Sequence, residues 1–451
     1  MAGQLILGLS ILVTLHEFGH FITAKWFKMR VDKFYLFFDF LFPIPTVLNF
    51  ALFKKKVGDT EYGLGWFPLG GYVSIAGMID ETQDAAALAK EPEPWEFRAK
   101  PAYQRLIVML GGVIVNVITG VVIFIALTFS NGNNFISKDE LNKNGIVALE
   151  LGKQIGLQSG DKVVRVNGAD YKSLADLRTS DVLLGENSSY TVLRNGQEIV
   201  VKIPSNFIEK LSDKKAAFIE PMAAFKVAEV AAPEEPGSQN GELLPAFSAG
   251  LKAGDYITAV NGQSIHFYHE IKEVLGKEAG KPIKLAINRQ GKSDTLSMVV
   301  SKSGQIGFLP ELLIKTTHED YTFAQSISIG TGRAFSVISD NIRGFKKIAT
   351  GDVSASKALS GPIGIAQMFG GVWDWNRFWM LTGLLSMALA FMNILPIPAL
   401  DGGHAIFLIY EMITGKPASE KVLERAQQVG MIILLALMAY TFGNDLVKAF
   451  F

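Results

Sequence analysis

Four long apolar stretches constrain the fold of this chain more than any other feature. They lie near residues 4–27, 105–129, 378–395 and 429–442. A helix needs about 20 mostly apolar residues to cross a bilayer, and each stretch approaches or exceeds this length, although the last is short. The 451 residues are 49% hydrophobic and have a mean hydropathy of +0.26, which is too apolar for an ordinary soluble protein. We therefore expect a polytopic α-helical membrane protein with about four transmembrane helices.

The orientation in the membrane is predicted from the basic residues near the span ends. Residues 1–4 carry no charged side chain, whereas the first two stretches are flanked or joined by Lys25, Lys28, Arg30, Lys33, Lys54, Lys55, Lys56, Arg98, Lys100 and Arg105. The positive-inside rule places this loop in the cytoplasm, and both termini and about residues 131–375 outside it. The first stretch lacks the basic start and small-residue cleavage site of a signal peptide, so we expect it to be retained.

Charge and cysteine content exclude several classes of partner and site. The 43 basic and 43 acidic side chains give a formal net charge of zero, which argues against nucleic-acid binding. The run Lys54-Lys55-Lys56 is better explained by contact with lipid headgroups in the bilayer. The chain has no cysteine, so disulfides and thiolate metal ligands are excluded. A metal site would have to use His, Asp or Glu.

The first apolar stretch contains His16-Glu17-Phe18-Gly19-His20, an H-E-x-x-H pattern. The two histidines are one helical turn apart, so both can bind one zinc ion, and Glu17 can act as a base on a water beside the metal. This arrangement is typical of peptide hydrolysis. A chance match on a soluble helix is the alternative, but ionisable groups at bilayer depth cost roughly 2.5–3.5 kcal/mol or more each unless they are paired or solvated.

A third zinc ligand is predicted near the end of the third apolar stretch, in the run from Asn393 to His404. Pro396 and Pro398 remove backbone donors and should unwind the helix, and two glycines follow Asp401. Catalytic zinc sites have three protein ligands and an open position, so Asp401 is the candidate for the missing ligand. It could also cap the following helix, a role compatible with binding zinc.

Two segments before the second apolar stretch, and the stretch itself, carry further structural patterns. Residues 31–53 are aromatic but interrupted by prolines, which favours a re-entrant or interfacial segment, and the glycine-rich residues 61–78 suggest short hairpin strands. Within the second stretch, Gly111, Gly112, Asn116 and Gly120 favour close helix packing. A direct role for Asn116 at the metal site is the alternative.

The segment between the second and third stretches contains an internal repeat. Residues 156–168 recur as residues 250–262, each copy with a Gly-Asp turn, a strand and an Asn-Gly turn, followed downstream by a hairpin. Both copies resemble PDZ domains, a fold that binds extended peptides by adding a strand to a sheet edge. Steric covering of the membrane face is the alternative role. Residues 324–347 then follow the pattern of an amphipathic helix.

Taken in order, these motifs resemble the site-2 protease family. The resemblance is carried by His16 to His20, the run Pro68-Leu69-Gly70-Gly71-Tyr72-Val73, the two PDZ-like repeats, the run Gly361 to Ala366, and Asn393 to His404. It implies an integral zinc metalloprotease of the bacterial inner membrane that cuts transmembrane segments of single-pass substrates. Such substrates are typically anti-sigma factors that another protease has already trimmed.

The resemblance also implies a role for each site residue. His16, His20 and Asp401 would bind one zinc ion, and Glu17 would be the catalytic acid and base. Asn393 would hold the substrate backbone, and a strand containing Gly71, Tyr72, Val73 and Ser74 would pair with the unwound substrate. Where the family carries Gly-x-Gly in the re-entrant segment, this chain has Phe37-Phe38-Asp39.

The expected domain layout follows the motifs along the chain. It consists of transmembrane helix 1 (1–30), a cytoplasmic or re-entrant β region (31–100), transmembrane helix 2 (101–130), PDZ-like domains (131–222 and 223–315), an amphipathic helical linker (316–374), transmembrane helix 3 (375–404), and a connecting helix with transmembrane helix 4 (405–451). The alternative function is a PDZ-bearing membrane scaffold or transporter in which the zinc is structural.

Overall fold

The computed structural model describes residues 1–41, 48–68, 70–78, 91–214, 217–231 and 245–450. Leu69 of the glycine-rich motif and Pro43 and Pro45 of the predicted re-entrant segment lie outside these ranges. The chain divides into two compact units. One combines Met1–Gly132 with Asp320–Phe451, and the other is Asn133–Glu319.

The first unit contains four helices that are long and apolar enough to cross a membrane, as predicted. They are α1 (Ala2–Trp26), α3 (Ala102–Asn131), α13 (Trp375–Ile394) and α15 (Glu420–Phe450). The last helix is longer than the apolar stretch that predicts it, because the good helix formers between 420 and 428 extend it in the N-terminal direction. The chain is therefore a polytopic membrane protein.

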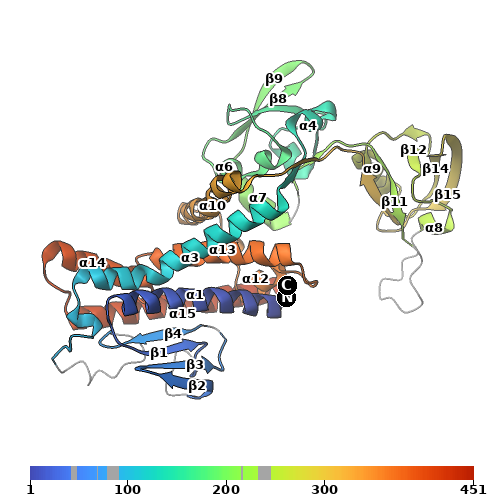
Figure 1. Ribbon diagram of the computed structural model, residues 1–451. Coiled ribbons are helices and arrows are strands. Elements are labelled where there is room, and N and C mark those ends of the chain that lie inside the picture. Colours follow the sequence, from blue (N-terminus) through green and yellow to red (C-terminus); the bar gives the residue numbers. More distant parts are fainter. Residues whose placement is uncertain (42–47, 69, 79–90, 215–216, 232–244, 451) are drawn as a thin grey trace. The chain divides into compact units, whose positions relative to one another are not determined.

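Helix α3 is central to the packing of the first unit. It packs against α1, α13, α10 (Phe323–Ala349) and α14 (Asp401–Thr414), and these helices run beside one another in Figure 1. A Cβ atom added at Gly19 of α1 would lie 2.3 Å from the carbonyl oxygen of Gly111, and one added at Gly120 would lie 2.5 Å from the Met387 sulfur. A Cβ atom added at Gly111 would lie 2.6 Å from the carbonyl oxygen of Gly19. The predicted close packing at Gly111 and Gly120 is therefore confirmed.

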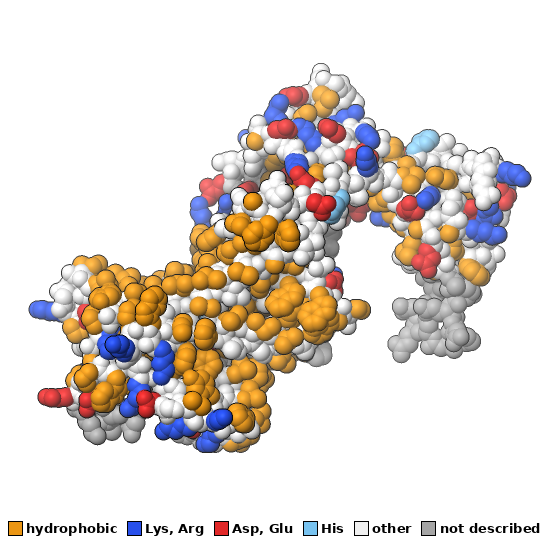
Figure 2. Space-filling view, in the orientation of Figure 1, with side chains coloured by type: hydrophobic (Ala, Val, Ile, Leu, Met, Phe, Trp, Pro, Cys, Tyr) orange, Lys and Arg blue, Asp and Glu red, His pale blue; other side chains and the backbone are white. Residues whose placement is uncertain are grey.

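The outer surface of the helical unit is strongly apolar. Figure 2 shows hydrophobic side chains covering much of the visible helical surface. On α3, Ile114, Ile118 and Val122 are 48%, 55% and 57% exposed and follow one another at helical spacing on one face. So extensive an apolar surface is expected where lipid replaces water as the solvent.

Residues 31–75 contribute a four-stranded sheet to the same unit. Its strands are β1 (Val31–Leu36), β2 (Ala51–Val57), β3 (Thr60–Gly65) and β4 (Tyr72–Ile75), in the order β2-β3-β1-β4. The strand expected near Tyr72 is therefore present. However, β3 and β4 do not form a hairpin with each other as the glycine pattern suggests, because β1 lies between them, parallel to β3 and antiparallel to β4. Strand β4 ends the sheet.

The other helices of the first unit are α10 and three short ones. The short helices are the 3-10 helix η1 (Phe97–Ala99), α11 (Ala355–Ala358) and α12 (Pro362–Met368). The predicted amphipathic helix is α10, which begins with a capping box between Thr322 and Gln325. The Gly361 motif begins α12, where Asp445 of α15 accepts hydrogen bonds from the backbone N–H groups of Gly361 and Gly364, both at 2.9 Å. This motif therefore joins α12 to the last helix.

The second unit is built from short strands and helices, and both repeats have the predicted hairpins. These are β8 (Ser189–Arg194) with β9 (Gln197–Lys202), and β14 (Pro282–Arg289) with β15 (Lys292–Val299). Asn195 and Gly196 connect the first pair, and both have positive φ. Two consecutive residues with positive φ are typical of the type I′ hairpin turn.

The remaining elements of this unit surround the hairpins. They are β5 (Asn133–Phe135), α4 (Lys138–Asn144), β6 (Ile146–Ala148), α5 (Glu150–Gln154), β7 (Lys162–Val166), η2 (Leu174–Arg178), α6 (Ser180–Leu183), α7 (Phe207–Lys214), β10 (Ile219–Pro221), β11 (Phe225–Val230), α8 (Pro245–Ser248), β12 (Tyr256–Val260), β13 (Gln263–Ser264), α9 (Tyr268–Lys277), β16 (Phe308–Leu312) and β17 (Thr317–Glu319). The buried residues form one core between residues 141 and 219 and another between 225 and 306.

The repeated Gly-Asp residues form the same ion pair in both copies. Asp161 accepts two hydrogen bonds of 2.7 Å from Arg194, and Asp255 accepts two of 2.7 Å from Arg289. Both aspartates are 1% exposed. The repeat therefore preserves a buried structural contact, and this contact explains why Gly-Asp recurs.

Candidate metal centre

Helix α1 brings the two histidines of the H-E-x-x-H pattern together. The His16 and His20 ring centroids are 4.8 Å apart with an interplanar angle of 84°, and their Nε2 atoms are 3.3 Å apart. The spacing of four residues produces this, because residues i and i+4 lie on the same helix face. His20 is buried and His16 is half-buried.

Asp401 meets these histidines from the start of α14. Its Oδ2 atom lies 3.3 Å from Nε2 of His16 and 3.5 Å from Nε2 of His20. Tetrahedral zinc with bonds of about 2.0–2.1 Å separates its ligand atoms by about 3.3–3.4 Å. The three atoms therefore already have the spacing of a zinc site, and one tetrahedral position remains for another ligand.

The residues next to Asp401 explain how it reaches the histidines. The chain between α13 and α14 turns tightly, with hydrogen bonds from Ile397 N–H to the Leu395 carbonyl and from Leu400 N–H to the Ile397 carbonyl. A Cβ atom at Gly402 would lie 2.4 Å from the Leu395 carbonyl oxygen, so glycine is required there. The N-cap of α14 is Leu400, and Asp401 is in the first turn. The predicted N-cap role of Asp401 is wrong, because the helix begins at Asp401 itself, one residue earlier than that role requires.

The opposite nitrogen of each histidine has its own partner on α3. The carbonyl oxygen of Val108 lies 2.8 Å from His20 Nδ1, so it accepts the Nδ1–H and leaves the Nε2 lone pair for a metal. The side-chain amide of Asn116 lies 3.2 Å from His16 Nδ1. Asn116 is 1% exposed. Its contact with His16 agrees with the alternative interpretation of the sequence, in which Asn116 acts directly at the metal site.

Gly112 of α3 makes room for both imidazoles. A Cβ atom there would lie 2.5 Å from His16 Cε1 and 2.5 Å from His20 Nε2. The atoms that such a Cβ would meet belong to the imidazole rings of the two histidines, and one of them is a possible zinc-binding nitrogen. Gly112 is thus a site residue that the sequence pattern placed among the packing glycines.

A cavity of about 260 Å³ opens beside the three possible ligands. Glu17 lines it together with Gly71, Tyr72 and Val73, three of the four predicted substrate-binding residues on or next to β4. Ser74 lies beside them in β4 and is buried. The end strand of the sheet therefore runs past the side chain that is best placed to act as a base.

Asn393 approaches the site from the last turn of α13. Its side-chain amide nitrogen lies 3.5 Å from His16 Nε2. The structure therefore places this residue at the metal centre, within reach of anything bound there. His404 also lines the cavity, one turn after Asp401 on α14.

The departure from the Gly-x-Gly pattern has a local structural consequence. Phe37 has φ 64°, a conformation that is strained for a bulky residue. The next residue but one, Asp39, is 6% exposed and accepts a hydrogen bond of 3.0 Å from the Tyr72 hydroxyl. This bond ties the turn after β1 to the first residue of β4, and it accounts for a buried carboxylate where glycine is usual.

Comparison with known proteins gives matches along almost the whole chain. Residues 4–437 match the profile of peptidase family M50. A protein of Neisseria meningitidis serogroup A whose name describes a zinc metalloprotease is 29% identical over an alignment of 467 positions that covers 98% of each chain. The regulator of sigma-E protease RseP of Escherichia coli K12 is 29% identical over an alignment of 462 positions that covers 98% of this chain and 97% of the relative.

Proposed function

This chain belongs to peptidase family M50 and is a zinc metalloprotease of the site-2 type, and we propose that it cuts single-pass membrane proteins within the bilayer. His16, His20 and Asp401 hold the zinc ion. The observation that carries the assignment is the 3.3–3.5 Å spacing of their three ligand atoms. Zinc bound there would supply the Lewis acidity that activates water and polarises a peptide carbonyl.

Glu17 is the acid and base of the reaction. It adjoins His16 and lines the same cavity, so its carboxylate can take a proton from the attacking water and give it to the leaving amine. Val73 of β4 lines the same cavity as this carboxylate. A structural zinc site does not require such a base, and this favours the protease over the scaffold or transporter.

The substrate is bound as an extended strand. A transmembrane helix hides its peptide bonds in internal hydrogen bonds, and unwinding it exposes polar groups that are costly in lipid. Strand β4 ends the sheet and can pair with the substrate, with Gly71, Tyr72, Val73 and Ser74 along the contact. Asn393, with both a donor and an acceptor, satisfies the other side.

The proposed setting is a bacterial inner membrane, and the partners are the lipid bilayer and a single-pass protein such as an anti-sigma factor. This choice is supported by the relatives named as regulators of sigma E. The β1–β4 sheet is proposed to be a re-entrant segment at the cytoplasmic side, and the basic residues around it support this orientation. Lys54, Lys55 and Lys56 are exposed on β2, where they can meet anionic headgroups.

The second unit contains two PDZ-like domains on the extracytoplasmic side, with limits near residues 131–222 and 223–315. The two separate cores and the two matching ion pairs support this division. Their proposed role is to admit substrates whose outer domain an upstream protease has removed. The segments 316–374 and 405–451 supply the amphipathic linker and the connecting and last membrane helices.

A reconstituted cleavage assay tests the function. The purified chain is placed in liposomes with a tagged single-pass protein, either full length or trimmed outside the membrane, and zinc content is measured by mass spectrometry. Glu17→Gln should retain zinc and lose cleavage, while Glu424→Gln, which changes an exposed carboxylate on α15, should leave both unchanged. Undiminished cleavage by Glu17→Gln would refute the proposed mechanism.

A further inference from the structure

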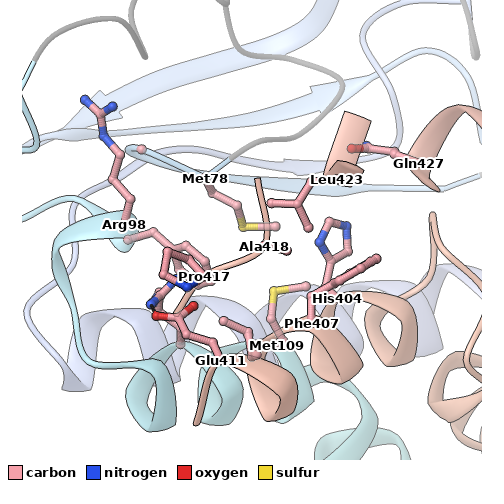
Figure 3. A pocket seen from close by; sticks show the side chains of 14 residues that line it. Met78, Arg98, Met109, His404, Phe407, Glu411, Pro417, Ala418, Leu423 and Gln427 are labelled. Atoms are coloured by element: carbon pink, nitrogen blue, oxygen red, sulfur yellow. Dashed lines mark hydrogen bonds and ion pairs between the residues drawn. The ribbon is translucent and has the colours of Figure 1, made fainter. Parts of the chain in front are cut away.

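A second cavity of about 330 Å³ lies in the helical unit beyond the metal centre. It is formed by the segment after β4, η1, the first turns of α3, the last turns of α14 and the start of α15. In Figure 3 the side chains of Met78, Met109 and Leu423 converge on its interior. Its volume is within the range of about 300–1,000 Å³ that is usual for pockets that hold small ligands.

This cavity shares a wall with the cavity of the metal centre. Met78, Met109, His404 and Gln427 line both. These four side chains therefore lie between the cavity of the metal centre and the second cavity. Two of the four are methionines, whose flexible thioether chains adapt to differently shaped apolar partners.

The direction of β4 identifies what can reach the second cavity. The strand runs from Tyr72 beside Glu17 to Ile75, and the chain then continues directly to Met78 at the shared wall. A substrate strand paired with β4 advances about 3.3 Å per residue, with alternate side chains on the same face. One side chain within about three residues of the scissile bond is thus carried to this wall.

The charges in the second cavity favour an uncharged occupant. Arg105 and Glu411 form an ion pair at its far end, and both side chains are largely buried, at 14% and 17% exposure. Arg105 also donates from Nε to the Lys100 carbonyl at 2.9 Å. Arg98 also lines the cavity, and its Nε lies 2.6 Å from the Glu96 carboxylate. Because each of these charges has an opposite partner, a single charged substrate group would lose its water there without gaining a counter-ion. Phe407 and Leu408 add apolar surface to the wall of the second cavity.

We propose that this second cavity is a specificity site that receives one large apolar side chain of the substrate, on the side of the scissile bond that leads toward Met78. The proposal rests on the proposed function, since it requires a substrate extended along β4. It assigns the choice of cleavage position to residues that line the second cavity and are not themselves zinc ligands. Filling the cavity or exposing one of its charges should then change which side chain is preferred at a single substrate position.

The first test fills the cavity from the loop between α14 and α15. Ala418→Phe adds an aromatic ring to the cavity wall, and the matched control Ser419→Phe adds the same ring at the next residue, which is exposed and does not line the cavity. Each substrate residue within four positions of the scissile bond is changed to Ala, Leu or Phe, and cleavage rates and sites are measured by mass spectrometry. Small changes in apolar pockets are worth about 10–200-fold in selectivity. Ala418→Phe should therefore reduce the Phe-to-Ala preference at least about tenfold at one position.

The second test changes the charge of the cavity. Glu411→Gln leaves the Arg105 guanidinium without its carboxylate, so an acidic substrate residue should become acceptable at the same position that responds to Ala418→Phe. An unchanged preference in both variants, or an equal change in Ser419→Phe, overturns the proposal. Cleavage by Glu17→Gln would instead overturn the proposed function, so the two failures are distinguishable.

Discussion

The side-chain amide of Asn116 lies 3.2 Å from Nδ1 of His16, on the side of the ring opposite the possible metal. The nearer atom is the amide nitrogen, and the amide oxygen is buried without a hydrogen-bond partner. Turning the amide over gives this oxygen a partner, so that Asn116 accepts the Nδ1–H and leaves the Nε2 lone pair of His16 for zinc. Val108 does the same for His20 with its carbonyl oxygen. Both histidines are therefore held by α3 in the tautomer that binds metal through Nε2.

Replacing this amide should weaken metal binding without removing a ligand. Asn116→Leu removes the acceptor at nearly constant volume, and losing such a contact typically costs about 10–100-fold in metal affinity. Asn116→Asp retains an acceptor and should stay close to wild type. Zinc affinity is measured by competition with a chelator, alongside the melting temperature. Wild-type zinc affinity in a folded Asn116→Leu variant would contradict this role.

Gly112→Ala should disrupt the metal centre from the opposite helix. The added methyl would lie 2.5 Å from His20 Nε2, so the imidazole must move away from Asp401. We expect loss of most bound zinc and of cleavage. Gly332→Ala is the control, because a Cβ atom at this position of α10 meets nothing within 4 Å. The zinc content of both purified variants tests this prediction. Normal zinc content in Gly112→Ala would contradict it, because it would show that the site can adjust to the added methyl group.

Asp401→Ala should release zinc as well as abolish activity. The carboxylate supplies the only negative charge among the three proposed ligands, and without it two neutral imidazoles bind the ion weakly. Added zinc at high concentration should restore little cleavage in this variant, whereas wild type stripped by a chelator should recover on adding zinc. Full zinc occupancy in purified Asp401→Ala would refute the assignment of this ligand.

The local part of this site could be predicted from the sequence. The four-residue spacing of His16 and His20 fixes a common helix face, and Pro396, Pro398 and the glycines after Asp401 indicate a broken helix. The contributions of α3 could not be predicted in the same way. Val108 acts through a backbone carbonyl, which any residue offers, and Gly112 looks like a helix-packing glycine until the imidazoles are placed against it.

The sheet shows the same limit at the level of the fold. Alternating residues and glycines indicate strands near residues 61–78, but they do not specify which strands pair. The observed order places β1 between β3 and β4, and this arrangement is set by contacts between residues distant in sequence. The second cavity is equally non-local, since η1, α3, α14 and α15 each contribute a part of its wall.

The ion pair of the second repeat predicts an acid-sensitive structure. Burial would raise the pKa of Asp255, but the hydrogen bonds from Arg289 and from the Lys252 N–H lower it overall. A lowered pKa contributes stability that is present above the ordinary Asp value of about 3.9 and is lost as the pH falls through the folded-state value. The protection of β12 and β14 amides against hydrogen exchange, relative to the intrinsic exchange rate at each pH, should therefore fall below about pH 4.

Asp255→Asn should remove this acid dependence. Hydrogen bonds to charged groups contribute about 1.5–3 kcal/mol, so we expect a loss of that order in the local free energy of unfolding at neutral pH. Asp294→Asn, which changes an exposed carboxylate on β15, should behave like wild type. Equal acid sensitivity in wild type and Asp255→Asn would assign the effect to other groups.

The last prediction concerns Asn393, whose amide lies 3.5 Å from His16 Nε2. A structural role would have Asn393 cap the backbone freed by Pro396 and Pro398, yet that segment has turns of its own, such as the 2.7 Å hydrogen bond from Ile397 N–H to the Leu395 carbonyl. The amide is thus available to hold an extended substrate. Asn393→Leu keeps the volume and removes both hydrogen-bonding groups, so cleavage should fall at least about tenfold, as for the loss of about 1.4 kcal/mol, while zinc content is unchanged.

Helix-breaking residues in the substrate provide the matched comparison for this variant. If Asn393 stabilises the unwound substrate, then a Gly or Pro near the scissile bond lowers the cost of unwinding and should restore part of the cleavage by Asn393→Leu. The same substrate should gain less with the wild-type enzyme, because the amide already supplies this stabilisation. Rates for the two enzymes on the two substrates form a double-mutant cycle, and additive effects would show that Asn393 acts independently of substrate unwinding.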